Sequence, residues 1–242
     1  MTAFLRFTIY APLASWGDPA VGEIRGSWDR PSRSALLGLV AAALGVLRED
    51  DPTHARLDAS LGVAVRVLAG GEGLVDYHTT QNPKASVVKR AAPATRRDAL
   101  AAGEPGTALS KRSLRQDALY VAALWLKPGA SVTLEEISAA LRSPVFTLYA
   151  GRKANALGLP LAPAIVDAES LAAALRDEPA LPEEFRYLRT RGAWGREVAH
   201  DPCDDFPPAL IAEQIVTRRD DSPIRSRWQF SNRVVHIGRI PT

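Results

Sequence analysis

Apolar and polar positions alternate along the first residues of the chain. Within 3–10, Leu5, Phe7 and Ile9 fall on one side of an extended segment, and the other side is mixed aromatic and basic. A period of two indicates a β-strand with one buried face. Residues 61–70 form a second predicted strand. Residues 117–129, rich in side chains that fit a pleated surface, form a third.

The first predicted helix follows the N-terminal strand and runs from about residue 32 to residue 47. Ser32 or Asp29 would cap it, and Pro31 suits the first turn, where a missing N–H costs little. Gly38 begins a row of small residues at helical spacing. Such a row more often indicates close packing against a sheet than a binding site.

Two further helices are predicted after the third strand. Residues 131–144 begin with Thr133 and Glu136 spaced as a capping box and stop at Pro144. Residues 167–178 form a shorter helix. The order strand, helix, strand, insertion, strand, helix matches the first part of a βαββαβ unit. We therefore predict an α+β fold with a ferredoxin-like (RRM-like) core.

The C-terminal third has a weaker pattern. We expect strands at 184–192, 210–220 and 225–240, with a turn-rich loop at 200–208. No internal repeat or linker divides the chain. Residues 1–242 are therefore predicted to be a single domain, whose strands between 200 and 242 complete or flank the core.

The segment 76–116 interrupts this pattern, because it has few large apolar residues and many cations. Eight Lys and Arg against two acidic residues leave +6 between His78 and Arg115, whereas the whole chain carries +3. A segment of this kind cannot build its own core. It is either a solvated loop or an arm that becomes ordered on a polyanion, and its charge favours contact with RNA or DNA.

Composition narrows the class of protein. Of 242 residues, 46% are hydrophobic, which can supply a sizeable core, and Cys203 is the single cysteine. No intrachain disulfide can form, which fits a reducing compartment. The N-terminus lacks the features of a signal peptide, and the longest apolar run, 35–47, is too short to span a bilayer. We expect a soluble cytoplasmic protein without membrane contact.

The start of the 32–47 helix is a candidate anion site. Arg25, Arg30 and Arg33 lie close to it in the sequence, and Ser32 adds a hydroxyl donor. Backbone N–H groups and the helix dipole favour an anion at this end. A capped helix with incidental arginines explains the spacing equally well, and the sequence leaves both interpretations open.

A second candidate contact is the stretch "YAGRKANAL" at 149–157. Tyr149 precedes Gly151, which allows close backbone approach, and Arg152 and Lys153 follow. An aromatic ring beside two cations can stack a base and hold its phosphate. A surface turn with charged residues is the alternative.

Signals for catalysis are sparse. The chain has no P-loop and no GxSxG elbow, and no zinc-like spacing surrounds Cys203, so we expect neither a metal site nor a cofactor. Tyr77 and His78, in "DYHTT" at 76–80, could act with Lys84 in metal-independent RNA cleavage. We favour the other interpretation, in which Tyr77 and His78 contact RNA or support the arm.

An ordered set of short motifs resembles a known family. The segments are "LRFTIYAPLASWG", "RPSRSALLGLVAAALG", "DYHTT", "ALYVAALWL" and "PVFTLYAGRK", which together span about residues 4–153. Their order and spacing resemble the CasD family, the RAMP subunit of the type I-E CRISPR Cascade complex.

This resemblance implies a fold and a function. The fold would be a ferredoxin-like RAMP core with a long β-hairpin thumb, here 76–116. The function would be non-catalytic capping of the crRNA 5′ handle, with docking on the neighbouring backbone subunit and on the large PAM-reading subunit. Target DNA would be met indirectly, through the complex. Type I-C relatives cleave repeat RNA, so an endoribonuclease is the alternative.

The candidate residues fall into three groups. The expected RNA contacts on the core are Arg25, Arg30, Ser32, Arg33, Arg152 and Lys153. The expected RNA contacts on the thumb are Lys89, Arg90, Arg96, Arg97, Lys111, Arg112 and Arg115. The expected stacking or positioning residues are Trp16, Tyr77, His78 and Tyr149.

Overall fold

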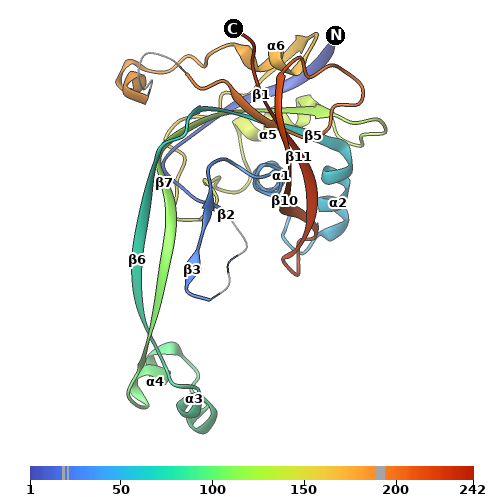
Figure 1. Cartoon of the computed structure of the whole chain (residues 1–242). Coiled ribbons are helices and arrows are strands. Elements are labelled where there is room, and N and C mark those ends of the chain that lie inside the picture. Colours follow the sequence, from blue (N-terminus) through green and yellow to red (C-terminus); the bar gives the residue numbers. More distant parts are fainter. Residues whose placement is uncertain (18–19, 21, 189–193) are drawn as a thin grey trace.

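A central antiparallel sheet organises the chain in the computed structural model, which describes residues 1–242 except 18, 19, 21 and 189–193 (Figure 1). Four strands form its centre, in the spatial order β8 (Ala164–Ala168), β1 (Thr2–Ala14), β7 (Gly106–Leu126) and β5 (Leu61–Ala69). Neighbours among these four strands are all antiparallel. The three strands predicted from the N-terminal two thirds of the sequence all lie in this centre.

The C-terminal part of the chain extends the sheet beyond β5. The added strands are, in spatial order, β9 (Glu197–His200), β11 (Gln229–Arg239) and β10 (Ile211–Ile224). Near the other end of the chain, β2 (Trp16–Gly17) pairs with β4 (Ser27–Trp28), and β3 (Ile24–Arg25) lies parallel to β7. The predicted strand 225–240 therefore begins late, because residues 225–228 form the turn between β10 and β11.

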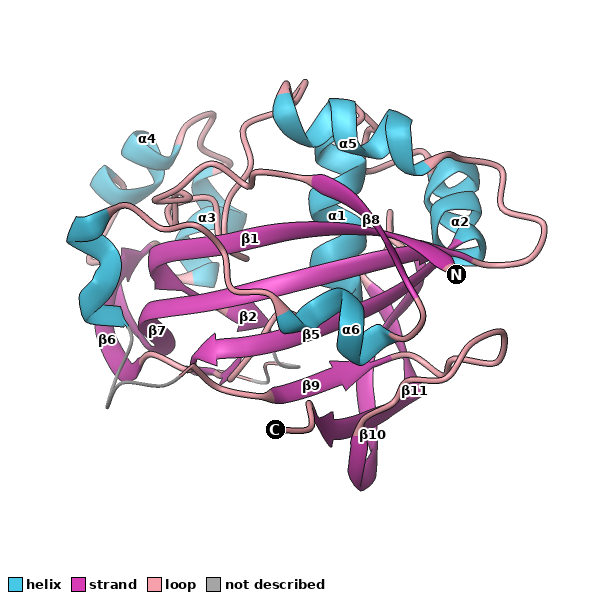
Figure 2. Ribbon diagram, turned by 90° about the horizontal axis from the view of Figure 1, so that it is seen from above, coloured by secondary structure: helices cyan, strands magenta, loops and turns pink. Residues whose placement is uncertain are grey.

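Helices and other segments cover both faces of the sheet (Figure 2). On one face lie α1 (Arg33–Ala43), α2 (Asp51–Ser60) and α5 (Leu134–Arg142). On the other lie α6 (Leu171–Arg176) and the 3-10 helix η1 (Glu183–Leu188). In β1, Leu5, Phe7 and Ile9 face the first layer, whereas Phe4 and Tyr10 face the second. The side of β1 predicted as mixed is thus also buried.

Local signals set the ends of the helices. Ser32 caps α1 by accepting a hydrogen bond from the backbone N–H of Ala35 at 3.2 Å. The helix ends earlier than predicted, because Gly45 takes a φ of +78°. Helix α2 was not predicted, although Asp50 caps it by accepting a hydrogen bond from the backbone N–H of Thr53.

None of the helices in the described ranges has the length and apolar character that a membrane span requires.

Two predicted elements need correction. The predicted strand 184–192 is wrong, because Glu183–Leu188 form η1, and its remaining residues fall in 189–193, outside the described part of the chain. The predicted helix 167–178 is shorter. Strand β8 continues to Ala168 through its pairing with β1, and Ser170 caps α6 by accepting from Ala173 N–H at 3.1 Å.

A long hairpin leaves the body of the protein. Strand β6 (Glu72–Asn82) pairs with the first half of β7, from Gln116 opposite Glu72 to Gly106 opposite Asn82. Its tip carries α3 (Ala85–Ala91) and α4 (Arg96–Ala101). The predicted strand 117–129 missed this half of β7, because residues 106–116 lack the buried face that pattern analysis detects. Backbone pairing, rather than a core, holds most of the hairpin.

Two residues with positive φ mark the root of this hairpin. Asp117 takes a φ of +55°, and Gly71 beside it takes +64°. A Cβ on Gly71 would lie 2.3 Å from the Gln116 carbonyl oxygen, so only glycine fits. The Tyr10 hydroxyl donates to the Asp117 carboxylate at 2.9 Å. The register shift here lies on the partner strand, between Val67 and Ala69 of β5, where the β5–β7 pairing ends and the β6–β7 pairing begins.

Gly62 tests the packing of the sheet. It lies opposite Trp125, and a Cβ at this position would be 2.0 Å from Trp125 Cε2. Because the indole is buried, we expect Gly62→Ala to lower the free energy of unfolding by about 1–3 kcal/mol, measured by urea denaturation. Gly73→Ala is the control, since nothing lies within 4 Å of that position. Equal effects at the two glycines would contradict this account.

Candidate nucleic-acid interface

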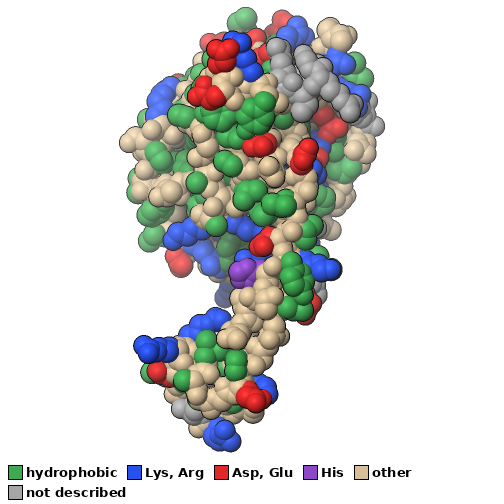
Figure 3. Space-filling view, turned by 90° about the vertical axis from the view of Figure 1, so that its left-hand side faces the viewer, with side chains coloured by type: hydrophobic (Ala, Val, Ile, Leu, Met, Phe, Trp, Pro, Cys, Tyr) green, Lys and Arg blue, Asp and Glu red, His purple; other side chains and the backbone are tan. Residues whose placement is uncertain are grey.

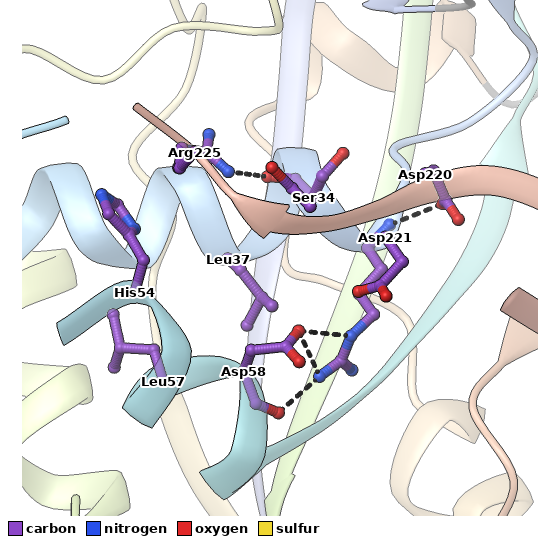
Figure 4. Close-up of a pocket in the computed structure, with 10 residues that line it drawn as sticks. Ser34, Leu37, His54, Leu57, Asp58, Asp220, Asp221 and Arg225 are labelled. Carbon is purple, nitrogen blue, oxygen red and sulfur yellow. Dashed lines mark hydrogen bonds and ion pairs between the residues drawn. The ribbon is translucent and has the colours of Figure 1, made fainter. Parts of the chain in front are cut away.

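The arginines at the start of α1 are enclosed by carboxylates. Arg33 is 5% exposed, and its guanidinium pairs with Asp201 and, at 3.0 Å, with Asp58. Its backbone N–H donates to Asp220 Oδ2 at 3.0 Å. Figure 4 shows Asp58 and Asp220 at this end of the helix. The anion that the helix N-terminus favours is therefore supplied by the protein itself.

Arg30 and Ser32 are likewise internal. Arg30 is 6% exposed and pairs with Asp29 and Glu197, and Ser32 is 3% exposed and serves as the helix cap. Burial alone would raise the pKa of Asp29, but the hydrogen bond and charge of Arg30 outweigh burial and lower it. Arg30, Ser32 and Arg33 were predicted as RNA contacts, and their burial and carboxylate partners indicate a structural role instead.

The cavity beside this helix start is too small for a ligand. Its volume is about 20 Å³, and its lining includes Asp58, Asp220 and Asp221 (Figure 4). Such a space holds about one water molecule, whereas ligand pockets measure about 300–1,000 Å³.

Trp16 was predicted as a stacking residue, and its position argues against that role. It is 2% exposed, and its indole N–H donates to the Tyr120 hydroxyl at 3.1 Å. Tyr120 in turn donates to the backbone oxygen of Asp29 at 2.7 Å. Trp16 therefore anchors the chain that leads into α1 and has no face free for a base.

A different set of arginines converges at the root of the hairpin. Arg25 on β3 lies opposite Arg112 on β7, and Arg112 lies opposite Asp76 on β6. Side chains of directly paired residues share one face of a sheet. Arg152, from the 149–155 loop, is close enough to Arg112 and Arg25 for their charges to act on it. Three cations thus gather around one carboxylate.

These three arginines lack the partners that Arg30 and Arg33 have. Within the part of the chain that the structure describes, no carboxylate forms an ion pair with Arg25, Arg112 or Arg152. Burial lowers the pKa of Arg152, and Arg112 and Arg25 lower it further. An anion bound here would relieve the repulsion among like charges.

The 149–155 loop is clamped beside the cluster. Gly151 has a φ of +83°, and a Cβ there would lie 1.8 Å from the Ser15 carbonyl oxygen. The buried Asn155 donates from its side chain to the Ala150 oxygen at 3.2 Å, and Ser15 N–H donates to the same oxygen at 3.1 Å. The loop therefore holds Arg152 in place and leaves Lys153 and Tyr149 exposed.

The remaining candidates lie along the hairpin. Because side chains alternate along a strand, His78 shares the face of Arg112, whereas Tyr77, Lys111 and Arg115 occupy the other face. The four cations of the tip, Lys89, Arg90, Arg96 and Arg97, are exposed and distant from the body. Figure 3 shows Lys and Arg side chains on the underside of the body beside the hairpin and again around its tip.

The possible acid–base residues are separated. Tyr77 and His78 are adjacent on β6, so their side chains leave opposite faces. Lys84 stands at the start of α3, where it pairs with Glu104 at 3.8 Å. A general base must reach the proton it removes. These three side chains do not converge on one point.

Among the described residues, no group of His, Cys, Asp and Glu side chains could hold a metal ion.

One exposed group was missed in the sequence. Arg48, Arg225 and Trp228 come together from the α1–α2 loop and the β10–β11 turn. The stretch "RSRW" at 225–228 was assigned to a strand. Two arginines within the three positions before an aromatic residue were a signal that could have found it.

Comparisons with known proteins give a consistent result. A family model described as CRISPR-associated protein (Cas_Cas5) matches residues 4–236. The CRISPR system Cascade subunit CasD of Escherichia coli (strain K12) is 31% identical over 169 residues, covering 66% of this chain and 70% of that protein.

Solved structures agree in fold. One chain in a structure described as a CRISPR RNA-guided surveillance complex is 26% identical with a TM-score of 0.65, covering 100% of this chain and 92% of that chain. A crystal structure described as a Cas protein is 24% identical with a TM-score of 0.58, covering 98% of this chain and 95% of that chain. The mixed α/β architecture around an antiparallel sheet is shared with both.

Arg33 tests the distinction between structural and binding arginines. Arg33→Ala removes the guanidinium that pairs with the buried Asp201 and the partly exposed Asp58, while Asp201 keeps Arg233 as a partner. We expect the free energy of unfolding to fall by about 1.5–3 kcal/mol, the cost of losing a hydrogen bond to a charged group. At a temperature where the variant is folded, its affinity for single-stranded RNA should match that of the wild type. Chemical denaturation and an RNA-binding assay measure the two effects.

The matched control is Arg97→Ala, at an exposed arginine of α4. Its stability should change by no more than about 0.5 kcal/mol. Weaker RNA binding by Arg33→Ala with unchanged stability would instead restore the anion-site interpretation of the α1 start.

Proposed function

This chain belongs to the CRISPR-associated Cas5 family, which confirms the resemblance drawn from its ordered motifs, and we propose that it binds the 5′ handle of a crRNA as a non-catalytic subunit of a type I-E Cascade complex. The observation that carries this proposal is the convergence of Arg25, Arg112 and Arg152 at the hairpin root without ion-pair partners. A surface of this kind suits a polyanion.

The fold proposed with this function is one RAMP domain over 1–242. Its ferredoxin-like core is supported by the strand order β8, β1, β7, β5 and by α1 and α5 on one face. The thumb is 76–116, which falls within the long hairpin of β6 and β7. The strands after residue 196 extend the core at the β5 edge.

The RNA would be held mainly through its phosphates. Arg25, Arg112, Arg152 and Lys153 would make these contacts at the root of the thumb, and Tyr149 would stack a base beside them. His78 lies on the same face as Arg112 and would position a neighbouring nucleotide. Further along the RNA, contacts would come from the tip residues Lys89, Arg90, Arg96 and Arg97. Lys111 and Arg115, predicted as RNA contacts, lie on the opposite face of the hairpin from Arg112.

Protein partners are part of the proposal. The face of the hairpin opposite Arg112 carries apolar side chains that the described residues leave uncovered: Ile24, Val75 and Tyr77 are 65%, 63% and 58% exposed. Exposed apolar surface of this kind supports contact with the neighbouring backbone and large subunits. Target DNA would reach the protein only through the assembled complex.

The absence of catalysis is proposed from the separation of Tyr77, His78 and Lys84. Purified protein incubated with labelled CRISPR repeat RNA, without divalent metal, should leave the RNA intact over hours. His78→Ala should behave identically. Defined cleavage by the wild type that His78→Ala abolishes would replace the binding function with a repeat endoribonuclease.

Arg112 tests the binding surface. Arg112→Ala removes the central cation of the cluster, so we expect about ten-fold weaker binding to handle RNA, as for loss of a hydrogen bond to a charged group. The slope of log affinity against log salt should fall by about one. Fluorescence anisotropy over a salt series measures both quantities.

Arg186→Ala is the matched control, because Arg186 is exposed on η1, on the other side of the sheet, and pairs with Glu183 at 3.2 Å. It should change neither affinity nor salt slope. Equal losses for Arg112→Ala and Arg186→Ala would show that overall charge, rather than the cluster, governs binding.

A further inference from the structure

The β10–β11 turn presents an unusual tryptophan. Trp228 is 53% exposed and takes a φ of +51°, a region that bulky side chains rarely adopt. Its backbone N–H donates to the Arg225 oxygen at 3.1 Å and closes the turn. Strained backbone of this kind persists only where surrounding contacts hold it, and it concentrates at functional sites.

Contacts from the α1–α2 loop hold the turn. The Arg48 guanidinium carbon lies 4.5 Å from the Trp228 ring centroid, and Arg48 donates to the Ser226 oxygen at 3.3 Å. The Asp51 carboxylate accepts from Ser226 N–H at 2.9 Å and from its hydroxyl at 2.5 Å. The indole also stacks on Phe230, with ring centroids 6.0 Å apart and an interplanar angle of 26°, so Arg48 and Phe230 together orient it.

The Arg225 guanidinium packs beneath the turn against the backbone of Gly38. A Cβ on Gly38 would be 2.2 Å from Arg225 Nη2, and Arg225 Nη1 donates to the Ser34 oxygen at 3.2 Å (Figure 4). Gly38 was predicted to pack against the sheet, and its open side instead admits this guanidinium. The Arg225 guanidinium carbon is 5.9 Å from the Trp228 ring centroid.

These cations are not neutralised by ion pairs. Across the ranges that the structure describes, neither Arg48 nor Arg225 has a carboxylate within ion-pair distance. Burial lowers the pKa of Arg225, Tyr149 opposes that effect, and Arg48 adds to it. The two guanidinium groups and the Tyr149 ring are therefore near neighbours.

This group continues the arginine cluster of the hairpin root. Tyr149 is close to Arg225, and Arg152, three residues further along the same loop, is close to Arg112 and Arg25. The long hairpin and the β10–β11 turn extend from the same side of the body (Figure 1). The two groups of cations and aromatic residues thus lie on the same side of the body, and the acidic residues Glu49, Asp50 and Asp51 follow Arg48 in the sequence.

Building on the proposed function, we propose that Trp228, Arg48 and Arg225 form a second subsite for single-stranded RNA, in which a nucleobase stacks on the exposed indole and adjacent phosphates contact the two arginines. Aromatic rings beside a cationic track are the usual means of holding single strands irrespective of sequence. The subsite would take nucleotides beyond those held at Arg25, Arg112 and Arg152.

The test compares a short handle RNA with one extended by several nucleotides at either end. The wild type should bind one of the extended RNAs more tightly than the short one. Trp228→Gly should weaken binding of that RNA about ten-fold, as for loss of one base stack, and should leave the short RNA unaffected. Glycine adopts a φ of +51° freely, so the turn should stay folded, and Trp228→Phe should restore most of the affinity.

Gly38→Ala provides a second variant, which replaces none of the three side chains of the subsite. The added methyl displaces the Arg225 guanidinium, so affinity for the extended RNA should fall while the melting temperature does not. The control is Ile215→Ala, at a side chain of β10 that is 68% exposed. It should alter neither quantity.

The outcomes separate this inference from the proposed function. If Arg112→Ala weakens binding of all the RNAs and Trp228→Gly weakens none, the handle-binding function stands and the subsite is overturned. If neither variant affects any RNA, both fail. If Trp228→Gly binds RNA normally but no longer co-purifies with the other subunits, the surface is a protein contact, and the subsite is again overturned.

Discussion

A buried network of two arginines and two aspartates joins the first helix to the last hairpin. Asp201 accepts from Arg33, from Arg233 at 2.7 Å and from Val63 N–H at 3.1 Å. Asp220 accepts from Arg233 at 2.7 Å and caps α1 through Arg33 N–H at 3.0 Å. Because each charge is removed from water, each depends on the others. The network sets where β10, β11 and their turn stand relative to α1.

This network divides the arginines of the protein into two kinds. Arg33 and Arg30 are buried and paired with carboxylates, so their ion pairs hold segments of the protein together. Arg25, Arg112 and Arg152 are brought near one another with one carboxylate among them. A folded protein tolerates that repulsion when the cluster stays partly hydrated, and a polyanion relieves it. Whether an arginine is buried with a carboxylate partner, rather than where it lies in the sequence, distinguishes the structural arginines from the candidate binding arginines.

The sequence pattern predicted what depends on local rules. Alternation identified β1, capping residues identified α1 and α5, and short motifs identified the family. It could not predict that the carboxylates around Arg33 come from Asp201 and Asp220, which lie far along the chain. Nor could it bring Arg25 to Arg112, because that pairing depends on the two-residue strand β3. The residues 106–116 escaped detection for a related reason, since a strand without a buried face has no apolar period.

The arginine cluster lies at the most rigid part of the long hairpin. Most of the hairpin is held by backbone pairing alone, so its tip must lose more freedom than its root when it contacts RNA. The hydrogen bond from Tyr10 to Asp117 and the close approach at Gly71 anchor the root to the core, and Arg112 lies a few residues beyond Asp117. In the proposed function, phosphates bound at the root would meet charges that are already ordered. The tip cations would then adapt to the RNA strand, and the root would define its register.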